Sequence, residues 1–140
     1  MDALHNLTSD GLQHEIVITL KDFDNVQTYA RYDNIVIGSE DEQYTLKTLG
    51  VYSGNAEDAL RHNVDENFTT LDRDNDKHLM NNCAQIFSGP WWYFQCNPGS
   101  QLFGPYNSER YNKRIRWSLE KDNNVKFVEV KMKHTGPKIM

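Results

Sequence analysis

The stretch "FTTLDRDNDKHLMNNCA", residues 68–84, concentrates oxygen-bearing side chains, because four of the five positions from Asp72 to Asp76 are aspartate or asparagine. Carboxylates this close together repel one another, and calcium prefers such hard oxygen ligands. An EF-hand loop is excluded, since the sixth position from Asp72 is Lys77 where glycine is needed and the twelfth is Cys83 where glutamate is needed. Two interpretations remain: a calcium site of another geometry, or a solvated acidic turn.

The next stretch, "NNCAQIFSGPWWYFQC", contains both cysteines of the chain, Cys83 and Cys96. Their number and spacing are compatible with a single disulfide or with two free thiols in the core. Between them lie Trp91, Trp92 and Tyr93. Three bulky aromatic residues in so short a segment indicate either a small core packed beside the cysteines or the wall of a ligand pocket.

Composition narrows the class of partner. The chain has 140 residues, which is enough for one domain with its own core. Its net charge of −5 argues against nucleic acid, which is bound through basic patches. The longest clean apolar run, residues 16–18, is far shorter than the ~20 residues of a membrane span. The N-terminal residues show no signal peptide.

The first half of the chain alternates apolar and polar residues, the pattern of half-buried strands. In "HEIVITLKDF" (14–23), the residues Ile16, Ile18 and Leu20 share one face. Two further stretches alternate in the same way and are rich in β-branched and aromatic residues: "VQTYARYDNIVIG" (26–38) and "YTLKTLGVYSG" (44–54). These stretches predict a twisted antiparallel sheet.

The rest of the chain is less periodic. "NAEDALRHN" (55–63) is predicted to form a short helix capped by Asn55. Residues 68–111 are rich in turn formers, and so long an irregular stretch is usually functional or braced by an ion. Residues 114–134 are predicted to form two strands around a turn at 121–124, with the last strand returning to the sheet. The predicted fold class is α+β.

Several motifs, taken in order, closely resemble the fibrinogen C-terminal domain family, which includes ficolins, tachylectins, angiopoietins and tenascins. They are "ARYDNIVIGSEDEQYTLKTLGVYSGNAEDAL", "FTTLDRDNDKHLMNNCA", "GPWWYFQC", "LFGPY", "RIRW" and "VKMK". The resemblance covers nearly the whole chain and places it in the C-terminal two-thirds of such a domain, without the N-terminal subdomain. It implies a central sheet subdomain at about 1–67, a calcium and pocket subdomain at about 68–124, and a returning strand at about 125–134.

The resemblance also implies an extracellular, secreted protein, with the signal peptide expected in upstream sequence. Two glycosylation sequons, at Asn6 and Asn67, are compatible with secretion. Family members oligomerise through upstream regions, so we expect the same of a longer chain. Like the family, the chain is expected to be a binding module and not an enzyme.

For the acidic stretch, the resemblance implies one calcium ion. Its ligands would be the side chains of Asp74 and Asp76 and the backbone carbonyls of His78 and Met80, with Asp72 just outside. The ion would offset the mutual repulsion of the carboxylates and fix the loop. The resemblance further implies a disulfide between Cys83 and Cys96, preceded by a cis peptide at Gln95–Cys96.

In lectin-like members, a pocket beside the calcium site takes the acetyl groups of N-acetylated sugars. The matching positions here are Phe87, Asn97, Tyr111 and Asn112. Asn97 replaces a histidine of the family pattern and Asn112 replaces a small residue, so extra volume opposes the acetyl methyl group.

Three outcomes therefore remain open. The first is a lectin-like module for acetylated glycans of the innate-defence type. The second is a domain that binds an extracellular protein receptor and has lost the acetyl pocket. The third is a remnant that cannot fold without the first subdomain.

Overall fold

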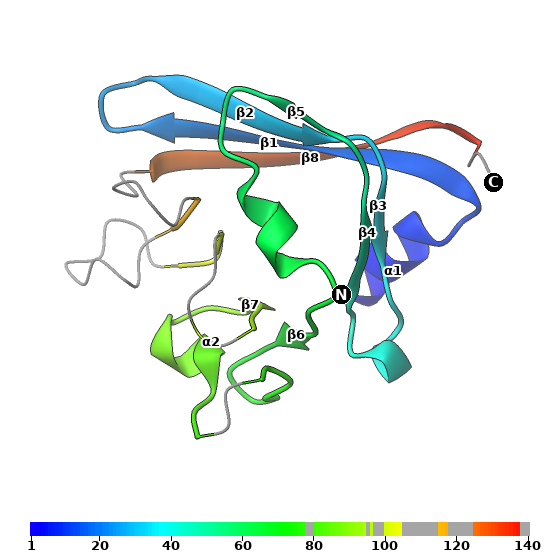
Figure 1. Cartoon of the computed structure of the whole chain (residues 1–140), viewed down its shortest axis with the longest axis vertical. Helices are drawn as coiled ribbons and strands as arrows, with labels where there is room; N and C mark the ends of the chain where they lie inside the picture. Colours follow the sequence, from blue (N-terminus) through cyan, green and yellow to red (C-terminus); the bar gives the residue numbers. More distant parts are fainter. Residues whose placement is uncertain (78–79, 95, 97–99, 105–114, 118–124, 138–140) are drawn as a thin grey trace.

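The computed structural model describes residues 1–77, 80–94, 96, 100–104, 115–117 and 125–137 (Figure 1). Its centre is a four-stranded antiparallel sheet in the order β5 (Tyr52–Gly54), β2 (Gln27–Tyr32), β1 (Leu12–Asp22) and β8 (Val125–Pro137). A two-stranded sheet of β3 (Ile35–Ile37) and β4 (Leu46–Leu49) stands beside it, and α1 (Asp2–Thr8) lies next to β3. These antiparallel sheets and short helices confirm the α+β class.

Strand β1 follows the predicted alternation. Every second residue from His14 to Leu20 is buried, and the residues between them are half-buried. Burial of this row of isoleucine and leucine side chains supplies the main apolar face of the sheet.

The two other predicted strands each divide in two. Residues 26–38 give β2 and β3, and residues 44–54 give β4 and β5, so each predicted strand passes from one sheet to the other. At the crossing, the Val51 amide donates to Asp33 Oδ1 at 2.6 Å. Gly50 permits this approach, because a Cβ at that position would lie 1.9 Å from the same oxygen. The division is thus fixed by a contact between distant residues.

The last strand returns to the sheet, as predicted. β8 pairs with β1 over its whole length, from Leu12 opposite Pro137 to Asp22 opposite Val125. It is three residues longer than expected at its C-terminal end. The predicted turn at 121–124 lies outside the described residues.

The prediction of a helix at 55–63 is wrong in extent and type. The structure has a 3-10 helix, η2 (Ala59–Asn63), with Asp58 at its N-cap. Asn55 is occupied elsewhere, because its Oδ1 accepts the Tyr29 amide at 2.9 Å and its own amide donates to the Tyr29 carbonyl at 3.1 Å. Asn55 therefore completes the pairing of β2 and β5 instead of starting a helix.

Below the sheet, the described residues between 68 and 104 form short elements (Figure 1). β6 (Phe68–Thr69) pairs with β7 (Trp91–Trp92), and α2 (Cys83–Ile86) lies between them in sequence. This pairing anchors both ends of the acidic and cysteine-containing segment next to the core.

Candidate functional site

The acidic loop runs from β6 towards α2 and is organised by its own polar side chains. The Thr70 hydroxyl donates to Asp72 Oδ1 at 2.7 Å and holds the pKa of that carboxyl below its ordinary value. The Asp76 amide donates to Asp74 Oδ1 at 3.3 Å, which folds the Asp74 side chain back over the loop. Asp72 and Asp74 are exposed, whereas Asp76 is half-buried.

Helix α2 holds this loop from the other side. Asn82 caps the helix through Oδ1, which accepts the Ala84 amide at 2.9 Å, and its Nδ2 donates to the Thr70 carbonyl at 3.0 Å. Gln85 Nε2 donates to the Leu71 carbonyl at 3.0 Å. Two side chains of one helical turn thus fix the backbone just before the aspartates.

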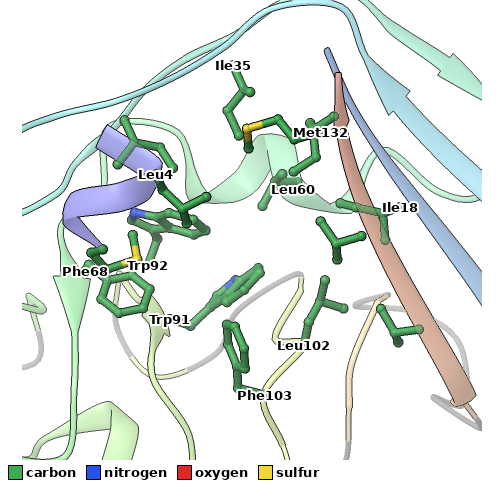
Figure 2. Close-up of a pocket in the computed structure, with 15 residues that line it drawn as sticks. Leu4, Ile18, Ile35, Leu60, Phe68, Trp91, Trp92, Leu102, Phe103 and Met132 are labelled. Atoms are coloured by element: carbon green, nitrogen blue, oxygen red, sulfur yellow. The ribbon is translucent and has the colours of Figure 1, made fainter. Parts of the chain in front are cut away.

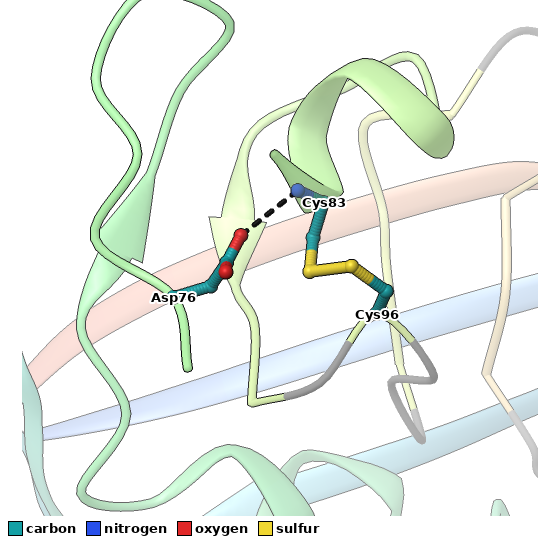
Figure 3. A group of neighbouring side chains, drawn as sticks. All are labelled: Asp76, Cys83 and Cys96. Atoms are coloured by element: carbon teal, nitrogen blue, oxygen red, sulfur yellow. Dashed lines mark hydrogen bonds between the residues drawn. A yellow bond between two sulfur atoms is a disulfide. The ribbon is translucent and has the colours of Figure 1, made fainter. Parts of the chain in front are cut away.

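Asp76 joins the loop to the cysteines (Figure 3). Its Oδ2 accepts the Cys83 amide at 2.8 Å, and Cys83 is bridged to Cys96 with their Cα atoms 4.8 Å apart. The predicted disulfide is therefore confirmed. The ligand atoms of these three residues lie within 4.8 Å of one another, but bridged sulfurs cannot act as thiolate ligands. Any ion here would have to use oxygen atoms.

The basic residues of the loop are engaged with other carboxylates. Arg73 pairs with Glu40 at 3.3 Å, and Lys77 pairs with Glu66 at 3.2 Å. In the part of the chain that the structure describes, Asp74 has no ion-pair partner. Carboxylate oxygens on an exposed loop are a donor set that fits calcium in its chemistry.

The remaining predicted calcium ligands are only partly described. Met80 is highly exposed, with a fractional exposure of 85%, and His78 lies outside the described residues. Gln95 lies outside them too, so the expected cis peptide before Cys96 stays a prediction.

Only one of the four predicted pocket residues falls in the described part. The Phe87 ring stacks on Tyr93, with centroids 5.9 Å apart and an interplanar angle of 19°, and the Arg116 guanidinium lies 5.8 Å from the Phe87 centroid. Phe87 is only 7% exposed. Burial also raises the pKa of Tyr93, whose hydroxyl donates to the Gly89 carbonyl at 2.6 Å. The other three positions, Asn97, Tyr111 and Asn112, lie outside the described residues.

The tandem tryptophans pack into the core. Trp91 Nε1 donates to Ser100 Oγ at 3.2 Å and Trp92 Nε1 donates to the Tyr44 carbonyl at 2.7 Å, while the two rings meet edge to face at 4.9 Å. Both are at most 5% exposed. Their satisfied N–H groups and deep burial support the core interpretation of the aromatic run.

Both tryptophans also line an apolar cavity of about 340 Å³, so the alternative interpretation of the aromatic run as a pocket wall applies to them as well (Figure 2). It lies between the inner face of the sheet, including Ile18 and Met132, and the aromatic side chains of Phe68 and Trp91. Its other walls come from elements far apart in the chain, so its full lining could not be predicted from one local motif. Every lining residue is apolar.

The two sequons lie in different surroundings, but their threonines share one property. Asn6 is exposed on α1, and Asn67 is half-buried with Nδ2 donating to Gln43 Oε1 at 2.6 Å. Thr8 and Thr69 are both fully buried. The threonine hydroxyls of both sequons are therefore inaccessible in the folded chain, so glycosylation at Asn6 or Asn67 would have to occur before folding.

Among the described residues, no helix has the length and apolar character to cross a membrane.

The chain is similar in sequence to one known protein family and to several known proteins. A family model for the C-terminal globular domain of fibrinogen beta and gamma chains matches residues 1–137. Ryncolin-4 of Cerberus rynchops is 39% identical over 137 residues, covering 94% of this chain and 38% of that protein. Tenascin-R of Gallus gallus is 35% identical over 135 residues, covering 95% of this chain and 10% of that protein.

The fold comparison agrees. The fibrinogen-like globe domain of human ANGPTL2 superposes with a TM-score of 0.84 at 30% identity, covering 94% of this chain and 62% of that structure. The chain thus spans well under half the length of these curated relatives, at 38% and 10%.

Proposed function

The chain belongs to the fibrinogen beta and gamma C-terminal globular domain family, and from that premise we propose that it is an extracellular, calcium-braced binding module that recognises acetylated glycans. The observation that carries the proposal is the arrangement of the acidic loop. Asp74 folds back over it, and Asp76 joins it to the bridged Cys83. A disulfide of this kind is typical of proteins from oxidising, extracellular compartments.

Asp74 and Asp76 would hold the ion, together with the backbone carbonyls of His78 and Met80. Calcium supplies the positive charge that offsets the repulsion between the carboxylates. The chain's own residues position the loop, because Asn82 and Gln85 hold the carbonyls of Thr70 and Leu71. Phe87, Asn97, Tyr111 and Asn112 would form the adjoining pocket.

A catalytic role has little support in these residues. A cysteine nucleophile needs a free, activated thiol. Cys83 and Cys96 are bridged to each other, so neither offers one.

Calorimetric titration of calcium into the oxidised chain tests the first half of the proposal. We expect one site of micromolar or tighter affinity, weakened about tenfold or more by Asp74→Asn, because the substitution removes a charged ligand from the shell. Asp72→Asn is the matched control: it removes an equal charge two positions away, at a residue proposed to lie outside the shell. Equal loss in both variants, or no binding by a chain that melts cooperatively, would contradict a specific site.

Retention on an N-acetylated matrix tests the second half. Retention should require calcium and should be abolished by free N-acetylated sugar. Retention that ignores the free sugar would exclude the acetyl pocket even where calcium binds.

The second candidate function is recognition of an extracellular protein receptor through the same region. Two observations favour it. Phe87 exposes only 7% of its surface, which leaves little aromatic face for an acetyl group. Phe94 and Phe103 are 48% and 58% exposed, and exposed aromatic residues are typical of protein-binding surfaces. Binding of a protein partner that is insensitive to acetylated sugar and is lost in Phe94→Ser would support this alternative.

A further inference from the structure

His14 is the polar member of the buried row of β1, and it is only 5% exposed. Both of its ring nitrogens face an oxygen atom: Nδ1 lies 3.2 Å from the Leu12 carbonyl oxygen, and Nε2 lies 3.5 Å from Asp10 Oδ2. A neutral imidazole carries one proton, so it can donate to only one of these oxygens. The other nitrogen then directs a lone pair at an oxygen atom, which is unfavourable at a buried position unless a cation lies between them.

The backbone of Leu12 orients both polar groups. Its amide donates to Asp10 Oδ1 at 2.9 Å, and its carbonyl lies against His14 Nδ1. Gly11 permits the tight turn between them, because its φ of +84° is rarely adopted by residues with a side chain. With Nδ1 donating to the carbonyl, Nε2 carries the lone pair. Histidines that bind metal ions usually have this arrangement, with one ring N–H on a carbonyl and the other nitrogen on the ion.

A second histidine lies directly opposite on β8. The register pairs His14 with His134, near the start of β1 and the end of β8, and directly opposite side chains lie on one face of the sheet. The two ring centroids are 5.9 Å apart and the rings are tilted by 58°. His134 forms no hydrogen bond or ion pair with the other described residues, so its ring can rotate towards His14 Nε2.

We propose that Asp10, His14 and His134 bind one zinc ion. Zinc takes imidazole nitrogen and carboxylate oxygen ligands, and a site with three protein ligands keeps a fourth position for water or another group. The ion supplies the positive charge that His14 Nε2 and Asp10 Oδ2 both face. A second proton on the His14 ring would supply the charge too, but it would give His134 no part. Calcium does not suit the site, because it takes oxygen ligands.

The ion would tie the turn after α1 to the last strand of the sheet. It would lie where the register of β1 and β8 shifts, between Gln13 and His14, and would stabilise the pairing there. A ligand that binds only the folded chain stabilises it by mass action. This site shares no residue with the acidic loop or the candidate pocket, so its failure and the failure of the proposed function are distinguishable.

Calorimetric titration of zinc into the oxidised chain, with calcium in excess throughout, measures the site. We expect one zinc ion per chain, bound with micromolar affinity. His134→Gln and Asp10→Asn should each weaken binding about tenfold or more, because each removes a ligand from the ion. His62→Gln is the matched control, since it removes an imidazole at an exposed position of η2 and should have no effect. Asp74→Asn, in the acidic loop, should have no effect either.

NMR of the histidine rings locates the ion independently of its affinity. One equivalent of zinc should shift the ring signals of His14 and His134 together. The Nδ1 proton of His14 should stay in place, because that nitrogen remains on the Leu12 carbonyl. His14→Gln is not used as the main test, because it also removes a buried ring from the core.

Two results would overturn the proposal. One is a chain that binds no zinc up to millimolar concentration, in which case His14 and Asp10 form a simple ion pair. The other is zinc binding that is unchanged in both His134→Gln and Asp10→Asn, which would place the ion elsewhere on the molecule.

Discussion

The central sheet and the segment from residue 68 to 104 are held together by different forces. The sheet is stabilised by backbone ladders, with β1 paired on both sides, and by a buried row that repeats every second residue. The described residues of the second segment form short elements, and its loop is fixed by side chains that bond to backbone groups and by one disulfide. One domain can therefore combine a sheet that is determined by its pattern of apolar residues with a segment whose structure depends on individual polar contacts.

The largest expected effect on stability is at a buried side chain in the core between the sheets and the rest of the chain. Leu46, in β4, is fully buried and lies outside the cavity lining. Leu46→Ala should lower the free energy of unfolding by about 3–5 kcal/mol, because it leaves a void in a packed core. Urea denaturation measures it, and Val51→Ala at a residue 70% exposed should change stability by under about 0.5 kcal/mol. Similar losses of stability in both variants would show that burial of Leu46 is not what stabilises this part of the molecule.

Removal of the disulfide should destabilise mainly the segment from residue 68 to 104. Replacing Cys83 and Cys96 by alanine should cost about 3 kcal/mol, because the bridge restricts the unfolded chain. Hydrogen exchange should accelerate most between residues 70 and 96, while the amides of β1 stay protected. Reduction of the wild-type chain should give the same pattern. Uniform acceleration over the whole sheet would show that the two halves unfold as one unit.

A smaller effect on stability is expected at Asn82, which caps α2 and also forms a hydrogen bond to the backbone of the acidic loop. Asn82→Ala should cost about 1–2 kcal/mol, because it removes the cap and the bond to the Thr70 carbonyl. Asn82→Asp keeps the cap acceptor but loses the donor, so it should cost less. Equal stability losses in the two variants would assign the whole effect to the loop contact.

The smallest effect concerns an exposed ion pair near the second sheet. Lys47 lies 2.7 Å from Glu42 and is the main cause of the lowered pKa of that carboxyl, with the Ser39 amide second. Because the pKa of Glu42 is lowered in the folded chain, its ion pair stabilises the fold at pH values above the ordinary carboxyl pKa. This stabilisation is lost as the pH falls through the lowered pKa. Lys47→Gln should therefore raise the Glu42 pKa towards its ordinary value, which a side-chain NMR titration measures. An unchanged pKa would mean that Ser39 dominates instead.

The sequence predicted the parts that depend on local pattern. The alternation from His14 to Leu20 follows from period-two burial alone. The pattern of residues 125–134 predicted a strand, whereas its return to β1 was also implied by the family resemblance. The α+β class follows from these strands. The cysteine pairing and the calcium ligands came only from the family resemblance, because spacing by itself left the state of the thiols open.

Other features were not predictable, for physical reasons. The bend between β2 and β3 depends on Asp33 meeting Val51, which are far apart in sequence. Helix α1 was missed because it is short and is held by tertiary contacts: the Thr8 hydroxyl accepts the Ile37 amide at 3.0 Å. The hydrogen bond from Gln85 to the Leu71 carbonyl could not be predicted from the sequence, because every residue has a backbone carbonyl that could accept it.

The contact between Asp76 and Cys83 has a thermodynamic consequence. One oxygen of Asp76 is held by the amide of a bridged cysteine. If calcium binds Asp76 as proposed, ion binding and thiol oxidation act on the same carboxylate, and their equilibria are linked. By reciprocity, whatever factor oxidation adds to calcium affinity, calcium adds to the resistance of the bridge against reduction. In calcium-poor, reducing surroundings such a chain would lose its ion and its bridge together.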